Sequence, residues 1–193
     1  MDLHDLDSRA LEGMRKLVAQ VRADQLRLPT PCADWTLHGL LRHLVSQNLG
    51  FAAAARGDEP DLAVWDSGSL GEDPLSAFDQ SARQVTDAFT GEDLLQRAMH
   101  LPELNVSLPG QAAVSFHFLD YLVHGWDVAR TIGVPAEMDA DLVAAAVKIF
   151  SGPRPELRPV REPFAQIIPL PDNASVGDQL LGRLGRDPNW SAA

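Results

Sequence analysis

Apolar side chains recur at intervals of three and four residues over long parts of the chain, which is the spacing of one face of an α-helix. The first such pattern starts at Leu3, and we expect its helix to end near Leu26. Its apolar positions are Leu3, Leu6, Ala10, Leu11, Met14, Leu17, Val18 and Val21. The prolines in Leu28–Cys32 then predict a rigid loop, because proline restricts the preceding residue and lacks the N–H group that a helix interior needs.

Capping residues mark the ends of the next two helices. Thr36 is expected to cap a second helix, which continues in the same apolar period until Gly57 ends it. A polar stretch rich in glycine, serine and aspartate follows and predicts a surface connection. Asp73 then begins a third helix, directly before a proline, and Gly91 ends it.

The middle of the chain combines short extended pieces with the longest predicted helix. The pattern between Met99 and Leu108 indicates extended segments. From about Gln111 to Ile132 the helical period returns, and Gly133 provides its terminator.

Two shorter helices are predicted in the remainder, at Leu142–Ile149 and from about Val176 to Leu184. A small extended segment is expected between them, at Phe164, Ile167 and Ile168. The chain shows no internal repeat and no break in composition. We therefore expect one mostly α domain over residues 1–193, with a four-helix bundle core and short additional helices.

Composition and charge exclude several kinds of partner. Apolar residues make up 45% of the 193 residues and charged residues 22%, which is the profile of a globular protein. The 27 acidic against 16 basic residues give a net charge of −11, which disfavours nucleic acid and anionic membranes as partners. The single cysteine excludes an internal disulfide and the multi-cysteine zinc motifs.

The sequence predicts a cytoplasmic protein. The first ten residues are acidic and lack the apolar core of a signal peptide. No run of about 18 apolar residues, as a membrane span requires, occurs in the chain. Its oligomeric state is not written in any residue, and a homodimer stays open.

Three side chains suggest a metal site. Asp120 and His124 lie four residues apart in the long helix and therefore share one face. His43 adjoins the apolar stripe of the second helix, which directs it toward the bundle interior or its rim. Packing these two faces together would bring two imidazoles and a carboxylate to one point, and this is a common ligand set for zinc and other divalent metals.

Simpler interpretations of the same residues stand beside the metal site. Asp120 and His124 at this spacing can form an ion pair on the helix surface, and His43 can be an ordinary, partly buried histidine. His117 lies one turn before Asp120 and is kept as a candidate pocket residue. Its alternatives are a fourth ligand, a general base, a partner of Asp120 or an exposed surface histidine.

Neighbouring residues leave further alternatives open. Asp127 can orient the imidazole of His124 or form a solvated pair with Arg130. Cys32 is interpreted as a small, buried apolar residue, because a lone cysteine usually has that role. Trp35 can line a pocket or fill the core.

Four strings of the chain carry a resemblance to a known family. They are Thr30–Thr36, Leu40–Val45, Asp120–Arg130 and Leu184–Trp190. Together they resemble actinobacterial proteins of the DinB-like superfamily, in particular the metal-binding group that is similar to the N-terminal domain of mycothiol-dependent maleylpyruvate isomerase. The His-Gly-Trp-Asp string at residues 124–127 is the most specific of these matches.

The resemblance implies a four-helix core that binds a divalent metal at the positions of His43, Asp120 and His124. The isomerase has a glutamate at the position of Asp120, so the shorter aspartate departs from the family pattern. The long C-terminal part that helps the isomerase to bind its substrate is not recognisable here. Zinc is the expected metal, with nickel or iron as alternatives.

The function that this resemblance implies is a metal-dependent thiol transferase or isomerase. A low-molecular-weight thiol such as mycothiol would be the cosubstrate, and a small electrophilic molecule would be the substrate. Metal-dependent hydrolysis and a non-enzymatic, ligand-binding stress-response protein are the alternatives.

Overall fold

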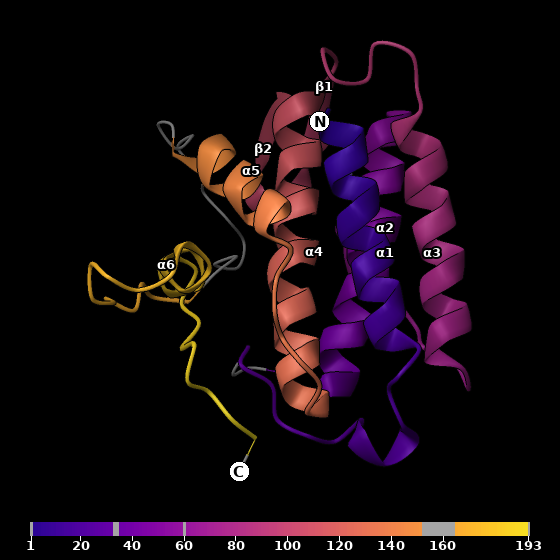
Figure 1. Ribbon diagram of the computed structural model, residues 1–193. Coiled ribbons are helices and arrows are strands. Elements are labelled where there is room, and N and C mark those ends of the chain that lie inside the picture. Colours follow the sequence, from indigo (N-terminus) through magenta and orange to yellow (C-terminus); the bar gives the residue numbers. More distant parts are fainter. Residues whose placement is uncertain (1, 33–34, 60, 152–164, 193) are drawn as a thin grey trace.

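A bundle of four long helices forms the centre of the protein (Figure 1). The computed structural model describes residues 2–32, 35–59, 61–151 and 165–192. The bundle helices are α1 (Leu3–Val18), α2 (Leu37–Arg56), α3 (Pro74–Phe89) and α4 (Gly110–Ile132). The most extensive contacts join α1 to α4 and α2 to α3. The predicted mostly α fold with a four-helix core is confirmed.

The helices run in two parallel pairs. Asp7 contacts His117 and Leu17 approaches Gly125, so α1 and α4 point in the same direction. Along α2 the order is reversed, because Asn48 contacts His117 whereas the carbonyl group of Leu44, one turn earlier, accepts a hydrogen bond from Tyr121 on α4. Helices α2 and α3 run in the same direction, so the chain needs a long connection between them. Helices α3 and α4 are antiparallel, because Phe89 near the end of α3 faces His117 whereas Phe78 near its start faces Tyr121.

The connection after α2 returns along that helix and packs on it. It contains the short helix η2 (Val64–Asp66), whose Trp65 is buried against Phe51 with ring centroids 5.0 Å apart. Gly50 makes this possible, because a Cβ atom there would lie 2.3 Å from the Trp65 ring. The absence of a side chain at this position lets the indole reach the helix backbone.

An antiparallel hairpin precedes α4 and confirms the extended segments predicted there. Strand β1 (Ala98–Leu101) pairs with β2 (Val106–Pro109), and the helical turn η3 (Pro102–Leu104) joins them. Two further helices, α5 (Ala140–Phe150) and α6 (Val176–Arg183), lie beyond α4, outside the bundle (Figure 1). No helix in the described ranges has both the length and the apolar character needed to span a membrane.

The predicted helix ends are largely confirmed by their caps. The Thr36 hydroxyl accepts the Gly39 N–H at the start of α2, and Gly57 ends this helix with a left-handed φ of 79°. The Asp73 carboxylate caps α3, and Gly133 ends α4 with a φ of 75°. These signals depend on local backbone geometry alone, which is why the sequence reveals them.

The expectation that the first helix continues to Leu26 is wrong, because α1 ends at Val18. After the C-cap Ala19, the N–H groups of Gln20 and Val21 bond to carbonyl groups only three residues back, which tightens the last turn. The chain then turns into the separate short helix η1 (Ala23–Gln25). The apolar period persists through this bend, so periodicity alone did not show it.

The extended segment expected near the C-terminus is not a strand in the described part of the chain. Ile167 and Ile168 have no strand pairing, and Ile168 instead donates its N–H to the carbonyl of Gly182 in α6 at 2.8 Å. Phe164, the third residue of that prediction, lies outside the described residues.

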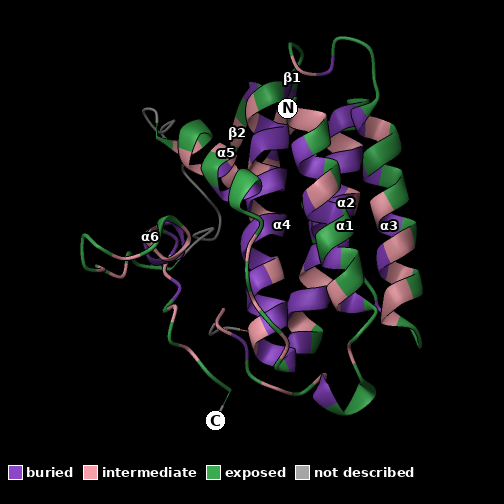
Figure 2. Ribbon diagram, in the orientation of Figure 1, coloured by how far each residue is buried: buried purple, intermediate pink, exposed green. Residues whose placement is uncertain are grey.

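Buried residues line the facing sides of the four bundle helices (Figure 2). Helix α4 is buried around most of its circumference, because the bundle covers one side and the hairpin and α5 pack on others. Polar groups on α4 therefore enter an environment with little water. Each of them requires a hydrogen-bond partner within the protein.

His117 meets this requirement through a polar network that joins all four bundle helices. Its side chain is fully buried, and its Nδ1–H donates to Asp7 Oδ1 on α1 at 2.6 Å. Its Nε2 lies 3.2 Å from the Asn48 side-chain oxygen on α2. The Asn48 amide donates in turn to the Ser81 hydroxyl on α3 at 2.9 Å. His117 therefore has a structural role.

We predict that His117→Gln lowers the free energy of unfolding by about 2–4 kcal/mol, because it leaves the buried Asp7 carboxylate without its partner. Chemical denaturation measures this change. His100→Gln, in the hairpin, is the matched control and should change stability by less than about 0.5 kcal/mol. Equal effects of the two substitutions would contradict the structural role of His117.

Candidate metal centre

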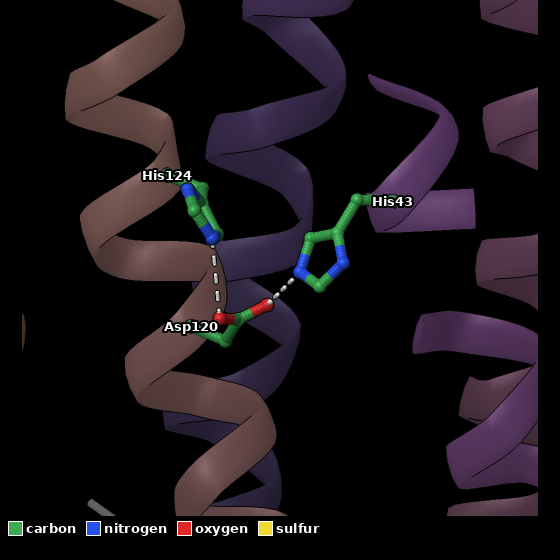
Figure 3. A group of neighbouring side chains, drawn as sticks. All are labelled: His43, Asp120 and His124. Carbon is green, nitrogen blue, oxygen red and sulfur yellow. Dashed lines mark ion pairs between the residues drawn. The ribbon is translucent and has the colours of Figure 1, made fainter. Parts of the chain in front are cut away.

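Two histidines and an aspartate converge between α2 and α4. His43 Nε2 lies 3.6 Å from Asp120 Oδ2, and His124 Nε2 lies 3.3 Å from Asp120 Oδ1. One ligand atom from each of the three residues lies within 4.8 Å of the other two. In Figure 3 both imidazoles point toward the carboxylate, one from each helix. The structure thus brings together the three residues that the sequence singled out.

Local sequence explains why these side chains meet. Asp120 and His124 are one turn apart on α4 and point to the same side. His43 adjoins the fully buried Leu40 and Leu44, which fix the rotation of α2 so that the imidazole faces α4. Hydrophobic packing therefore positions the polar group.

An unsatisfied oxygen of Asp120 indicates that the three residues fit a metal ion. Its Oδ2 is buried and has no hydrogen-bond partner among the described residues. Such an atom is costly unless a cation or donor reaches it. Ligand atoms around a tetrahedral zinc ion are about 3.3 Å apart, which follows from bond lengths of about 2.0–2.1 Å. The two separations between Asp120 and the histidines are 3.3 and 3.6 Å but run to different carboxylate oxygens, and a set with one ligand atom from each residue lies within 4.8 Å.

Two of the three side chains are partly exposed to solvent. The His43 and Asp120 side chains keep 19% and 18% of their surface exposed, whereas His124 is almost fully buried. A cation at this point would therefore have protein ligands on its inner side and free coordination positions toward solvent. This is the arrangement of catalytic rather than structural zinc sites.

Charge compensation shifts the pKa values of both α4 residues. Burial alone would raise the pKa of Asp120, but the nearby imidazoles of His124 and His43 outweigh this effect and hold the pKa far below its usual range. Burial alone would lower the pKa of His124. The negative charge of Asp120 and the hydrogen bond to Asp127 outweigh it and raise the pKa to about 9. The two residues form an ion pair at neutral pH.

Asp127 holds His124 from the opposite side. His124 Nδ1–H donates to Asp127 Oδ2 at 2.8 Å, which leaves Nε2 directed toward Asp120. The sequence left open whether Asp127 orients this imidazole or pairs with Arg130 at the surface. Asp127 is fully buried, and Arg130 instead donates to the carbonyl of Trp190.

Arg186, to which no role was assigned from the sequence, contacts Asp127. Its guanidinium is 1% exposed and donates to Asp127 Oδ2 at 2.9 Å from the segment after α6. The contact with His124 and Arg186 holds the pKa of Asp127 below its usual range despite burial. The family resemblance of Leu184–Trp190 indicated that this segment matters, but it did not indicate which residue Arg186 would contact.

The remaining candidates lie at different distances from the site. The indole of Trp35 stacks on His43 with ring centroids 4.4 Å apart and is 6.0 Å from the ring of His124. Cys32 is half-buried and does not belong to the ligand group formed by the described residues. His117 is likewise outside this group, since both of its ring nitrogens face other residues.

Comparison with solved structures finds the same fold in a mycothiol-dependent isomerase. A crystal structure of a mutant of the mycothiol-dependent maleylpyruvate isomerase superposes with a TM-score of 0.59. The two sequences are 12% identical, and the match covers 75% of this chain and 67% of the other. At this identity the comparison shows a shared fold.

Comparison of sequences identifies the family. Two uncharacterized proteins of Mycobacterium tuberculosis, from strains CDC 1551 / Oshkosh and ATCC 25618 / H37Rv, are each 34% identical to this chain over 184 residues. These matches cover 92% of this chain and 94% of each relative. The family model described as "Mycothiol maleylpyruvate isomerase N-terminal domain" matches residues 8–129, which include His43, Asp120 and His124. The chain therefore belongs to the mycothiol maleylpyruvate isomerase N-terminal domain family.

Proposed function

We propose that His43, Asp120 and His124 bind one divalent metal ion and that the protein is a metal-dependent thiol transferase or isomerase. Zinc is the metal that this ligand set favours, with nickel or iron as alternatives. The observation that carries the proposal is the unsatisfied, buried Asp120 Oδ2 between two imidazoles. The family description and the name of the structural neighbour support mycothiol as the thiol.

The residues of the chain have separable tasks in this proposal. His43 and His124 each present one Nε2 atom, and Asp120 presents a carboxylate that neutralises part of the ion's charge. Asp127 accepts the Nδ1–H of His124 and so keeps the Nε2 lone pair of the neutral imidazole available. When bound, the ion supplies Lewis acidity, which lowers the pKa of a coordinated thiol and populates the thiolate at neutral pH.

A thiolate at this site can isomerise a double bond by adding to it and leaving again. Its sulfur forms a C–S bond with one carbon of an electrophilic double bond, and the π electrons move to the neighbouring carbonyl group. Rotation about the resulting single bond and cleavage of the C–S bond restore the double bond and the thiolate. The thiol is therefore required but not consumed. In a transfer reaction the C–S bond is kept, and the enolate formed by the addition takes up a proton from solvent.

The purified protein is expected to bind one zinc ion per chain, measured by elemental analysis and by calorimetric titration of the metal-free protein. His43→Ala and His124→Ala should each weaken this binding by roughly a factor of 100 or more, because each removes one of three ligands. His100→Ala, which changes the hairpin histidine, is the control. Unchanged binding in both ligand variants would exclude this site.

The raised pKa of His124 predicts opposite effects of pH on stability and on zinc binding. Its pKa in the folded protein is about 9, against 6.5 for an unperturbed histidine. The metal-free protein should therefore have its full stabilisation below pH 6.5 and lose it as pH rises through about 9. Zinc must replace a proton on Nε2, so its affinity should rise about tenfold per pH unit between 7 and 9.

Denaturation of the metal-free protein and calorimetric titrations across this pH range test both parts of that prediction. Asp120→Asn lacks the charge that raises the pKa of His124. In this variant the free energy of unfolding should therefore decrease less as pH rises toward 9. A zinc affinity that stays constant with pH would contradict the proposed proton exchange.

Activity is tested with zinc-loaded protein, mycothiol and maleylpyruvate, the substrate that the name of the structural neighbour suggests. A second, general electrophile reports thiol transfer. Turnover that needs both mycothiol and His43 supports the proposal. Turnover without any thiol would indicate metal-dependent hydrolysis instead. Zinc binding without turnover would identify a ligand-binding protein.

A further inference from the structure

The two imidazoles of the site are held in different ways. His124 is fixed by the hydrogen bond from its Nδ1–H to Asp127. His43 makes no hydrogen bond within the described part of the chain, and its Nε2 faces Asp120 at 3.6 Å. Histidines that ligate metals almost always donate their second N–H to a partner, which fixes the ring orientation. Another contact must therefore orient His43.

The indole of Trp35 provides that contact. Its ring centroid lies 4.4 Å from that of His43 with an interplanar angle of 30°, so the two rings are nearly stacked. The same indole lies 6.0 Å from His124, while the two imidazoles are 5.3 Å apart and meet edge to face. Trp35 thus covers one face of His43 and approaches the second imidazole as well.

The backbone on both sides holds Trp35 in this place. Its N–H donates to the carbonyl of Cys32, and its carbonyl accepts the hydroxyl hydrogen of Thr30, both at 2.9 Å. Pro29 and Thr36 form a bridge that closes the loop next to the start of α2. These contacts fix the backbone from which the indole projects toward His43.

Helix α2 accommodates the indole at Gly39, one turn before His43. A Cβ atom at Gly39 would lie 3.4 Å from the Cβ and Cδ1 atoms of Trp35, at the short end of ordinary van der Waals contact. A larger residue there would press the indole away from the helix. Trp35 is therefore packed between the backbone of α2 and the ring of His43.

We propose that Trp35 is the positioning residue of His43: its stacked indole holds the imidazole in the rotamer that directs Nε2 toward Asp120. For His43 the ring contact replaces the hydrogen bond that Asp127 provides for His124. The inference rests on the proposed metal site, because its purpose is to preorganise a ligand. It also makes a statement about the metal-free protein that can be tested separately.

The test compares Trp35→Leu, which removes the aromatic face, with Trp35→Phe, which keeps one. Trp190→Leu is the matched control, since it removes another half-buried tryptophan. We expect Trp35→Leu to weaken zinc binding by about tenfold, the scale found when the partner of a ligating histidine is lost. Trp35→Phe should restore most of the affinity, and Trp190→Leu should leave it unchanged.

NMR of the metal-free variants supplies a readout that general loss of packing does not reproduce. In the wild type the ring protons of His43 lie in the ring current of the indole, and Trp35→Leu should shift these resonances while those of His100 stay in place. Melting curves confirm that each variant is folded. Should Trp35→Leu fail to fold, Gly39→Val is expected to shift the same resonances, because its branched side chain extends past a Cβ position that already contacts the indole.

The outcomes separate this inference from the proposed function. If zinc affinity and the His43 resonances are unchanged in folded Trp35→Leu, Trp35 does not position His43, while the metal site stands. If the wild type binds no zinc, the proposed function fails, and the NMR comparison alone decides whether the indole orients His43. Equal losses of affinity in Trp35→Phe and Trp35→Leu would also overturn the inference, because stacking would then not be the cause.

Discussion

The carboxylate of Asp120 carries a negative charge between two helices. The organisation of this site follows from the need to compensate that charge. Two imidazoles face its oxygens at 3.3 and 3.6 Å, yet one oxygen still has no hydrogen-bond partner among the described residues. The carboxyl nevertheless keeps a pKa far below its usual range. Positive charge must therefore stand beside it, either as a protonated imidazole or as a metal ion that replaces the proton.

Helix α4 has two histidine sites with opposite character. His117 is saturated, since Asp7 and Asn48 face its two ring nitrogens and the network continues to the third helix. Only the Nδ1 atom of His124 has a hydrogen-bond partner outside the site, which is Asp127. Its Nε2 faces the Asp120 carboxylate, one oxygen of which has no hydrogen-bond partner among the described residues. The first arrangement holds the helices together. The second is suited to accept a ligand, and the two lie only two turns apart on one helix.

The described residues beyond the matched family segment also support the site. The family model ends at residue 129, whereas Arg186 reaches back to Asp127 from the segment after α6. The relatives of Mycobacterium tuberculosis align over 92% of this chain, so most of its length is shared with them. The segment after α6 thus helps to fix the orientation of His124 through the buried Asp127 carboxylate.

The sequence by itself determined the helices, most of their ends and the face on which Asp120 and His124 lie, because periodicity and capping are local properties. It did not show that α1 stops before Leu26, since the apolar period continues through the bend. Only the tertiary structure decided that His43 meets Asp120 and His124 and that Arg186, 59 residues after Asp127, contacts that carboxylate. Contacts between distant segments depend on how whole helices pack, and no local pattern encodes that.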